Sequence, residues 1–210
     1  MPKTANIRKT TAENILDAAE QLFADRGVDA VSVRQIATAA GSSNNFAVQY
    51  HFGDKAGLVR ALFERRLPSL DARRGELLAE VAREGRLQDV QALLEALLLP
   101  MWEQRDSSGR RSYVAFLAAH WRFTPQSDLR LRHKDLAPTT EMIFSLIRAA
   151  IPQLSSPLYG TNSRLAFSFF LNSIVEYDHG ESRPNSGEAD ERFIRKVLKL
   201  TTLLLVAPEE

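Results

Sequence analysis

The sequence has no cysteine in its 210 residues, which excludes disulfide bonds, thiolate metal sites and cysteine nucleophiles together. It also has no run of about 18 consecutive apolar residues, the length that a transmembrane helix needs. Its first residues, MPKTANIRKTT, lack the apolar segment of a secretory signal peptide. From these absences we expect a cytoplasmic protein with no membrane partner.

Net charge is almost absent as well, because 27 Lys and Arg face 26 Asp and Glu and leave +1. Any contact with phosphate must therefore come from locally placed side chains and not from a field over the whole chain. The sequence offers no paired histidines at metal-ligand spacing and no nucleotide-binding or nucleophile motif. We therefore expect no metal, no cofactor and no enzymatic activity.

The sequence does contain helical periodicity along most of its length, and no stretch alternates with a period of two. Two capping boxes, Thr10-x-x-Glu13 and Ser32-x-x-Gln35, begin the first two helices, and Gly27 is placed to end the first. The pattern predicts an all-α fold. The expected helices cover residues 10–25, 32–40, 44–51, 55–66, 69–83, 87–103, 110–123, 127–150, 157–179 and 188–206.

Prolines mark the expected divisions of the chain, because proline removes a backbone donor and disfavours a helix interior. Pro68 separates a small N-terminal unit, residues 1–54 with a connecting helix over 55–67, from a larger helical domain over 68–210. Pro138 is expected to kink or divide the helix over 127–150. Ser156 followed by Pro157 is expected to cap the next helix.

The first 54 residues hold three short helices with a glycine turn at Gly41, an arrangement that fits a helix-turn-helix. The third helix is rich in Asn and Gln, whose side chains match the donor and acceptor of adenine, and Ala47 could meet a thymine methyl group. We expect Phe46 and Val48 to pack inward. The alternative for this polar stretch is an ordinary surface loop.

Ser32-Val33-Arg34-Gln35-Ile36-Ala37, then Ala40-Gly41, then Tyr50-His51-Phe52 and Lys55 resemble the TetR family of transcriptional repressors, over about residues 10–60. The resemblance implies an N-terminal helix-turn-helix DNA-binding domain joined to a larger helical ligand-binding and dimerisation domain. Together with the side-chain chemistry it gives these DNA-contacting candidates: Ser32, Arg34, Ser43, Asn44, Asn45, Ala47, Gln49, Tyr50, His51 and Lys55.

The chain departs from the family in one place, because the stretch from Gly41 to Phe52 is one residue longer than the family's usual pattern. Gln49 and Tyr50 are therefore both candidates for the phosphate contact that a tyrosine commonly makes there. Lys55 is expected to meet backbone phosphate, with Lys3, Arg8 and Lys9 as further cations near the N-terminus. Arg60, Arg65 and Arg66 are expected on a solvated helix face.

Aromatic side chains gather in the larger domain around residues 101–121. An apolar cavity with one or two polar groups is what a small-molecule site requires. The candidate ligand contacts are Met101, Trp102, Tyr113, Phe116, His120 and Trp121. The alternative is that these residues only fill the core.

The last two expected helices are apolar around much of their circumference and need cover on several sides. The resembled family pairs these helices with their symmetry mates, which implies a homodimer that presents two recognition helices to a palindromic operator. The candidate dimer contacts are Phe167, Phe170, Ile174, Ile194, Val197, Leu198 and Thr201.

These features predict a homodimeric repressor that binds double-stranded operator DNA and is released by a small-molecule effector. Two other functions fit parts of the pattern. One is an all-helical small-molecule-binding protein or enzyme that does not bind DNA. The other is a DNA-binding protein that dimerises but responds to no ligand.

Overall fold

The computed structural model describes residues 10–42, 44, 46–106, 108–121, 134–180 and 187–209, and every regular element within them is helical. The all-α prediction is therefore confirmed. In chain order the elements are α1 (Thr11–Arg26), α2 (Val33–Ala39), α3 (Ala47–Phe52), α4 (Lys55–Arg83), α5 (Val90–Glu103), α6 (Ser112–Trp121), η1 (Lys134–Leu136), α8 (Pro138–Ala150), α9 (Ser156–His179) and α10 (Gly187–Val206).

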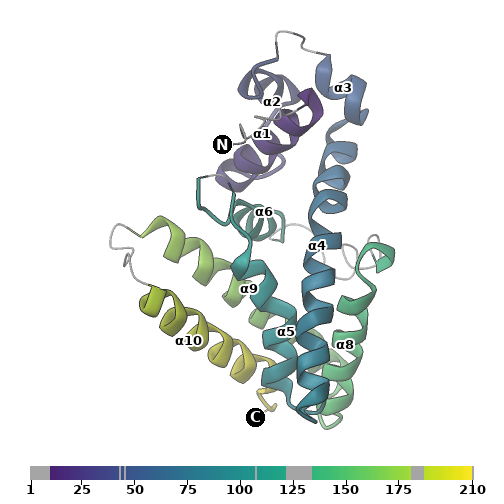
Figure 1. Ribbon diagram of the computed structural model, residues 1–210, viewed down its shortest axis with the longest axis vertical. Coiled ribbons are helices and arrows are strands. Elements are labelled where there is room, and N and C mark those ends of the chain that lie inside the picture. Colours follow the sequence, from purple (N-terminus) through teal and green to yellow (C-terminus); the bar gives the residue numbers. More distant parts are fainter. Residues whose placement is uncertain are drawn as a thin grey trace, which may run out of the picture.

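Helices α1, α2 and α3 form a small bundle at one end of the molecule (Figure 1). Both predicted capping boxes are present: Thr10 with Glu13 begins α1, and Ser32 with Gln35 begins α2. Each box satisfies backbone donors that the first turn of a helix leaves free. The core between the three helices is apolar and fully buried, with contributions from Ile15, Ala19, Phe23, Val31, Ile36, Ala37 and Val48.

Helix α4 joins this end of the molecule to the rest and runs along most of its length (Figure 1). We expected the helix to end at Pro68, and this prediction is wrong, because α4 continues through Pro68 to Arg83. A proline inside a helix removes one backbone hydrogen bond, but packing can hold the helix together across it. Here α4 packs against α5 and α8 beyond the proline, and Leu70 and Leu78 are buried there.

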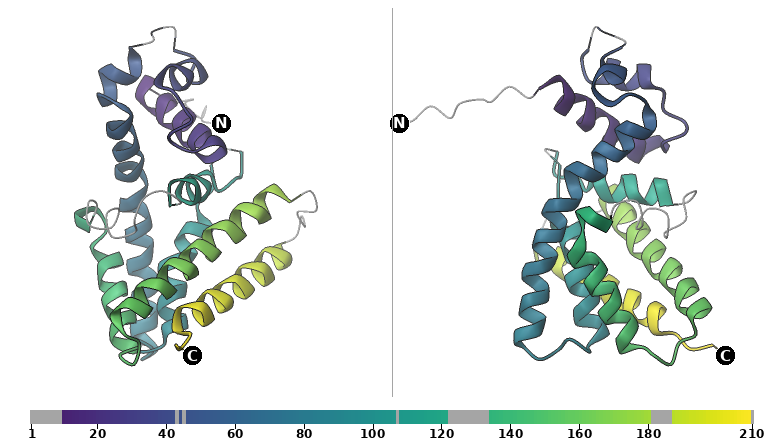
Figure 2. Two further views of the ribbon diagram at one scale, coloured as in Figure 1. Left: turned by 180° about the vertical axis from the view of Figure 1, so that it is seen from behind. Right: turned by 90° about the vertical axis from the view of Figure 1, so that its right-hand side faces the viewer.

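The larger domain consists of α5, α6, α8, α9 and α10 around the second half of α4 (Figure 2). Pro138 stands in the first turn of α8, so it begins a helix where we expected a kink or a division; residues 122–133 of the expected helix lie outside the described residues. Ser155, one residue before the predicted cap, caps α9 by accepting a hydrogen bond from the Leu158 amide.

The side chains of α9 and α10 that we predicted as dimer contacts are buried within one chain and are not exposed for a partner. Phe167, Phe170, Ile174, Ile194, Val197, Leu198 and Thr201 are all buried within the single chain. Helices α9 and α10 pack against each other, and α9 also packs against α6 and α8, so these seven side chains are covered within one chain. The large apolar side chains that remain exposed on these helices are Leu165 on α9 and Leu200 and Leu203 on α10.

One buried carboxylate joins the small bundle to the larger domain. Glu20 of α1 is only 2% exposed and accepts hydrogen bonds from Arg65 and Arg66 of α4 and from Ser112 of α6. Burial alone would raise the pKa of Glu20, but hydrogen bonds and positive charge from Arg66 hold it below its ordinary value. The prediction that Arg65 and Arg66 are solvated is wrong, whereas Arg60 is exposed beside Glu64.

Candidate nucleic-acid interface and internal cavity

The exposed end of the small bundle begins with the first turn of α2. The Ser32 hydroxyl accepts a hydrogen bond from the Gln35 amide and donates one to the Gln35 side chain, so it is already used in the cap. Arg34, two residues later, is exposed and points a positive charge outward from α2. Of this predicted pair, Arg34 therefore has the freer side chain for a phosphate contact.

The connection from α2 to α3 turns at Gly41, whose φ of 71° is a left-handed conformation that favours glycine. After the turn, the Ser42 hydroxyl accepts from the Asn44 amide, and the Asn44 side-chain oxygen accepts from the Phe46 amide. We expected a helix from Asn44, but α3 begins only at Ala47 because Asn44 closes this turn instead. The candidates Ser43 and Asn45 lie outside the described residues.

Helix α3 divides its side chains clearly between core and surface. Gln49, Tyr50 and His51 are exposed, with Tyr50 83% exposed and packed edge-on against the His51 ring at 5.0 Å between ring centroids. Two predictions are corrected by burial. Ala47 is only 5% exposed, so its methyl group cannot meet a thymine, while Phe46 is 70% exposed and does not pack inward as Val48 does.

Lys55 stands at the first position of α4 and ties the small bundle together. Its Nζ donates to the backbone oxygens of Val28 and Asp29, at 3.0 and 3.4 Å, in the connection between α1 and α2. An ammonium group has three donors, so two bonds to carbonyls leave one for an incoming phosphate. The arrangement holds the lysine at the edge of the surface that carries Gln49 and Tyr50.

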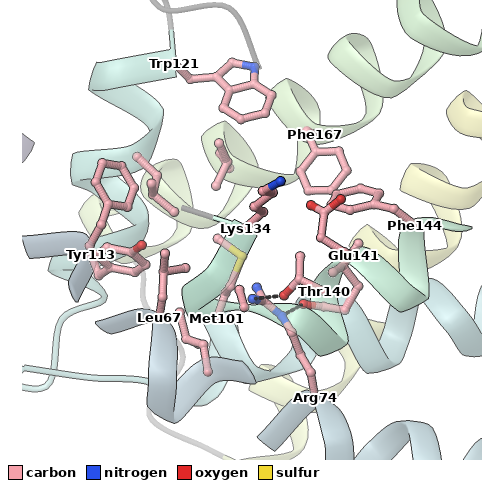
Figure 3. Close-up of a pocket in the computed structure, with 16 residues that line it drawn as sticks. Leu67, Arg74, Met101, Tyr113, Trp121, Lys134, Thr140, Glu141, Phe144 and Phe167 are labelled. Atoms are coloured by element: carbon pink, nitrogen blue, oxygen red, sulfur yellow. Dashed lines mark hydrogen bonds between the residues drawn. The ribbon is translucent and has the colours of Figure 1, made fainter. Parts of the chain in front are cut away.

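An internal cavity of about 130 Å³ lies in the larger domain between α4, α5, α6, α8 and α9 (Figure 3). Its wall is mostly apolar, and its polar members are Arg74, Tyr113, Lys134, Thr140 and Glu141. The apolar members are Phe63, Leu67, Leu70, Leu97, Met101, Leu117, Trp121, Ala137, Phe144, Phe167 and Leu171. An apolar cavity with a few polar groups has the character of a small-molecule site.

The six predicted ligand contacts do not all reach this cavity. Met101, Tyr113 and Trp121 line it. Phe116 is fully buried in an aromatic cluster with Phe23, and His120 stacks on its ring. Trp102 lies in a separate cluster, where the Arg111 guanidinium sits 3.2 Å from its ring centroid. The expectation of one cavity wall shared by all six is therefore corrected for Trp102, Phe116 and His120.

A buried polar group beside the cavity was missed by the sequence analysis. Asp71 of α4 accepts hydrogen bonds from the backbone amides of Thr139 and Thr140 at the start of α8. Arg74, one turn further along α4, donates to the Leu97 oxygen of α5 and to the Thr140 hydroxyl. In the sequence these residues look like solvated charges on a surface helix, because their partners lie 23 to 69 residues away.

The described residues contain no group of three or more His, Asp or Glu side chains placed to hold a metal ion. None of the helices in this part of the chain combines the length and the apolar character needed to cross a bilayer.

Comparison with known proteins finds a family match over residues that include α2 and α3. Residues 15–62 match the model of bacterial regulatory proteins of the tetR family. The chain is 33% identical over 127 residues to the transcriptional repressor KstR2 of Rhodococcus jostii, across 58% of this chain and 59% of that protein. It is 39% identical over 62 residues to the transcriptional regulator AcrR of Shigella flexneri, across 30% of this chain and 28% of that protein.

The chain thus spans less than two thirds of the length of each curated relative. The similarity in fold covers more of the chain. The structure is similar to that of the tetR family transcriptional regulator PfmR of Thermus thermophilus over 96% of this chain and 99% of that one. The TM-score of this match is 0.52 and the sequence identity is 20%. The helix-turn-helix of α2 and α3 lies within the matched residues. The N-terminal part of the chain, residues 15–62, therefore matches the tetR family of bacterial regulatory proteins.

Proposed function

We propose that the protein is a homodimeric transcriptional repressor that binds a palindromic operator and is released from it by a small molecule. The observation that carries this proposal is the exposed polar surface of α3, where Gln49, Tyr50 and His51 project from the small bundle. Directional hydrogen-bonding side chains suit base edges in the major groove, while Arg34 and Lys55 supply charge for phosphates at its margin.

A chain of contacts supports communication between the cavity and this surface. Tyr113 lines the cavity, and the Arg66 guanidinium lies 6.0 Å from its ring centroid. Arg66 in turn donates two hydrogen bonds to Glu20 of α1. A ligand that displaces Tyr113 therefore acts next to the carboxylate that fixes the small bundle on α4.

The exposed leucines of α9 and α10 support the dimer. Leu203 and Leu165 are more than half exposed, and Leu200 is also exposed, on two helices that already pack against each other. Pairing this surface with a second copy would cover them and form a four-helix contact around a two-fold axis. Two recognition surfaces would then face the same side of a duplex, about one helical turn apart.

Selection of bound duplexes from a random pool tests DNA binding and its symmetry together. We expect recovered sequences with two inverted half-sites about one helical turn apart. A pool that does not enrich would contradict operator binding. Recovery of a single half-site would contradict the dimer on DNA.

The dimer has its own test in sedimentation. Leu203→Glu places a charge in the proposed contact and should shift the protein from dimer to monomer at micromolar concentration. Met142→Glu is the matched control, because Met142 is similarly exposed, at 57%, but lies on α8 away from this surface. A wild-type protein that sediments only as a monomer, or an equal shift in both variants, would count against the proposed contact.

A further inference from the structure

The cavity contains two polar groups whose hydrogen-bonding capacity is not used by the described residues. Arg74 is 4% exposed and Tyr113 is 3% exposed, and both line the cavity. Arg74 donates through Nε and Nη1, but its Nη2 forms no hydrogen bond with a described residue. The Tyr113 hydroxyl likewise has no hydrogen-bond partner among the described residues.

Both groups are aimed at the same space. Figure 3 shows the Arg74 guanidinium and the Tyr113 hydroxyl extending into the cavity from α4 and from α6. Neither Nη2 of Arg74 nor the Tyr113 hydroxyl is enclosed by protein on all sides, so both can donate a hydrogen bond into the cavity. Two such donors on one cavity wall suit an acceptor carried by a ligand.

The charges near Arg74 leave room for an anion. Asp71 lies one turn away on α4, and its charge favours the charged form of Arg74. The two side chains are bridged by the Thr140 hydroxyl, which accepts from Arg74 Nη1 and donates to Asp71, so Nη2 of Arg74 is left for a further acceptor. Lys134 adds a second positive charge to the cavity wall, and Glu141 a negative one. Burial lowers the pKa of Arg74 to about 10, so the group is still a cation at neutral pH.

The rest of the cavity wall indicates the size and the apolar character of the ligand. It is aliphatic and aromatic, with Leu67 and Met101 on one part and the neighbouring rings of Trp121, Phe144 and Phe167 on another (Figure 3). The cavity volume of about 130 Å³ is close to the roughly 150 Å³ of an engineered apolar cavity that holds benzene. A single six-membered ring or a short branched chain therefore fills it.

We propose that the cavity binds a small apolar carboxylic acid, with its carboxylate on Arg74 and Tyr113 and a body of about one ring against the apolar wall. As an effector this acid rests on the proposed repressor function, but its binding can be measured without DNA. Arg74 also holds α5 and α8 through Leu97 and Thr140, so the carboxylate would bind where three helices meet.

Three probes with the same ring separate the possible head groups: benzoate, benzamide and benzylamine. Calorimetry on the full chain should show benzoate binding at least about tenfold tighter than neutral benzamide, because hydrogen bonds to a charged group are the stronger ones. Benzylamine should bind more weakly than either. Equal affinity for all three probes, no binding of benzoate, or a preference for benzylamine would overturn the proposal.

Tyr113→Phe is the primary variant, because the hydroxyl that it removes makes no hydrogen bond to the described residues and the fold does not depend on it. We expect its thermal midpoint to match the wild type and its benzoate affinity to fall about fivefold to tenfold. Arg74→Met should abolish the preference for benzoate over benzamide. Arg83→Met is the matched control, since Arg83 is exposed at the far end of α4 and should leave binding unchanged.

Benzoate binding that survives both Tyr113→Phe and Arg74→Met would overturn the assigned site. The effect of benzoate on duplex binding is measured separately, with the duplexes recovered from the random pool. If benzoate binds with the expected dependence on Tyr113 and Arg74 but leaves duplex affinity unchanged, the ligand class is supported and release by this ligand is contradicted. If the protein binds its duplex and does not bind benzoate, the ligand class fails and operator binding stands.

Discussion

The small bundle and the larger domain are stabilised by different kinds of hydrogen bond. In the small bundle the helix caps are local: Thr10 with Glu13 and Ser32 with Gln35 link residues three apart, at the surface, and Lys55 adds a longer link to Val28. In the larger domain and at its junction with α1, buried charged groups link helices far apart in the sequence, as Glu20 does with Arg66 and Asp71 with Thr140.

The small bundle carries the reading surface, which is the exposed Gln49, Tyr50 and His51 of α3, and its helices α1 and α2 are capped by local bonds. A capping box depends on neighbouring residues only, so it keeps its geometry when the rest of the molecule changes. A buried charge depends on partners from several helices, and any shift of one helix leaves part of it unsatisfied. We therefore expect signals to arise in the larger domain and to reach α3 as a movement of the whole small bundle.

The largest expected effect comes from the junction between the two ends. Glu20→Ala should lower the free energy of unfolding by about 3 kcal/mol, the low end for a broken buried ion pair. The low end applies because Arg65 and Arg66 keep about a fifth of their side chains exposed and can be hydrated when Glu20 is removed. Urea unfolding measures the change, with the exposed Glu80→Ala on α4 as the control. A loss no larger than that of Glu80→Ala would show that the junction is not held by charge.

The same carboxylate predicts how the junction responds to acid. The pKa of Glu20 is lower in the folded protein than in the unfolded chain, so its stabilising contribution is complete above an unfolded pKa of about 4.3 and is lost as pH falls through the folded value. The difference in unfolding free energy between wild type and Glu20→Gln should therefore be largest near pH 7 and should shrink as pH falls below about 4. A difference that stays constant over this range would contradict a charged Glu20 at the junction.

A smaller effect distinguishes the two kinds of contact on the reading surface. Gln49→Ala should cost about 1–3 kcal/mol on the selected duplex and little on a scrambled one, because it removes a base-edge contact. Lys55→Ala should weaken both duplexes alike and lower the salt dependence of binding, because it removes a phosphate contact. Titrations at fixed salt compare the two variants, and their thermal midpoints report any loosening where Lys55 holds Val28. Equal losses on both duplexes in both variants would refute the division of roles.

The smallest effect tests whether the local bonds are independent of the rest. Ser32→Ala removes one capping box and should lower the free energy of unfolding by about 1 kcal/mol. Ser145→Ala is the matched control, because the Ser145 hydroxyl is exposed and bonds a carbonyl one turn back inside α8, where no cap is lost. A Ser32 loss of 3 kcal/mol or more would show that the small bundle also depends on long-range contacts.

The same contrast decides how much the sequence could predict. Helices α1 and α2 were located to within a residue or two, because their capping boxes, apolar spacing and glycine stops are all local signals. The ends of α5, α9 and α10 and the start of α6 were also close to their predicted positions. The predicted end of the helix over 110–123 lies outside the described residues. Local signals failed at Pro68 and at Asn44, where packing and a turn decided the outcome.

Side-chain partners across the fold were beyond prediction from one sequence. The apolar stripes of α9 and α10 were recognised, but periodicity does not say which element covers a stripe. Here α10 covers α9 together with α6 and α8. Arg74 and Asp71 resemble surface charges until α5 and α8 are placed against them. Of the candidate cavity residues, Met101, Tyr113 and Trp121 were found because aromatic and sulfur side chains are scarce enough to stand out.

Because α4 is continuous from Lys55 to Arg83, a small change of angle near the cavity would become a larger displacement at the reading surface. Lys55 lies 13 residues from Pro68, about 20 Å along a helix axis. Pro68 has no amide hydrogen, so the helix is one bond weaker there and bends more readily at that point than elsewhere. A bend of about 5° at Pro68 moves Lys55 by nearly 2 Å over this length. In a two-fold dimer both reading surfaces move, and the distance between them changes by up to about twice that amount, roughly the axial rise of one base pair.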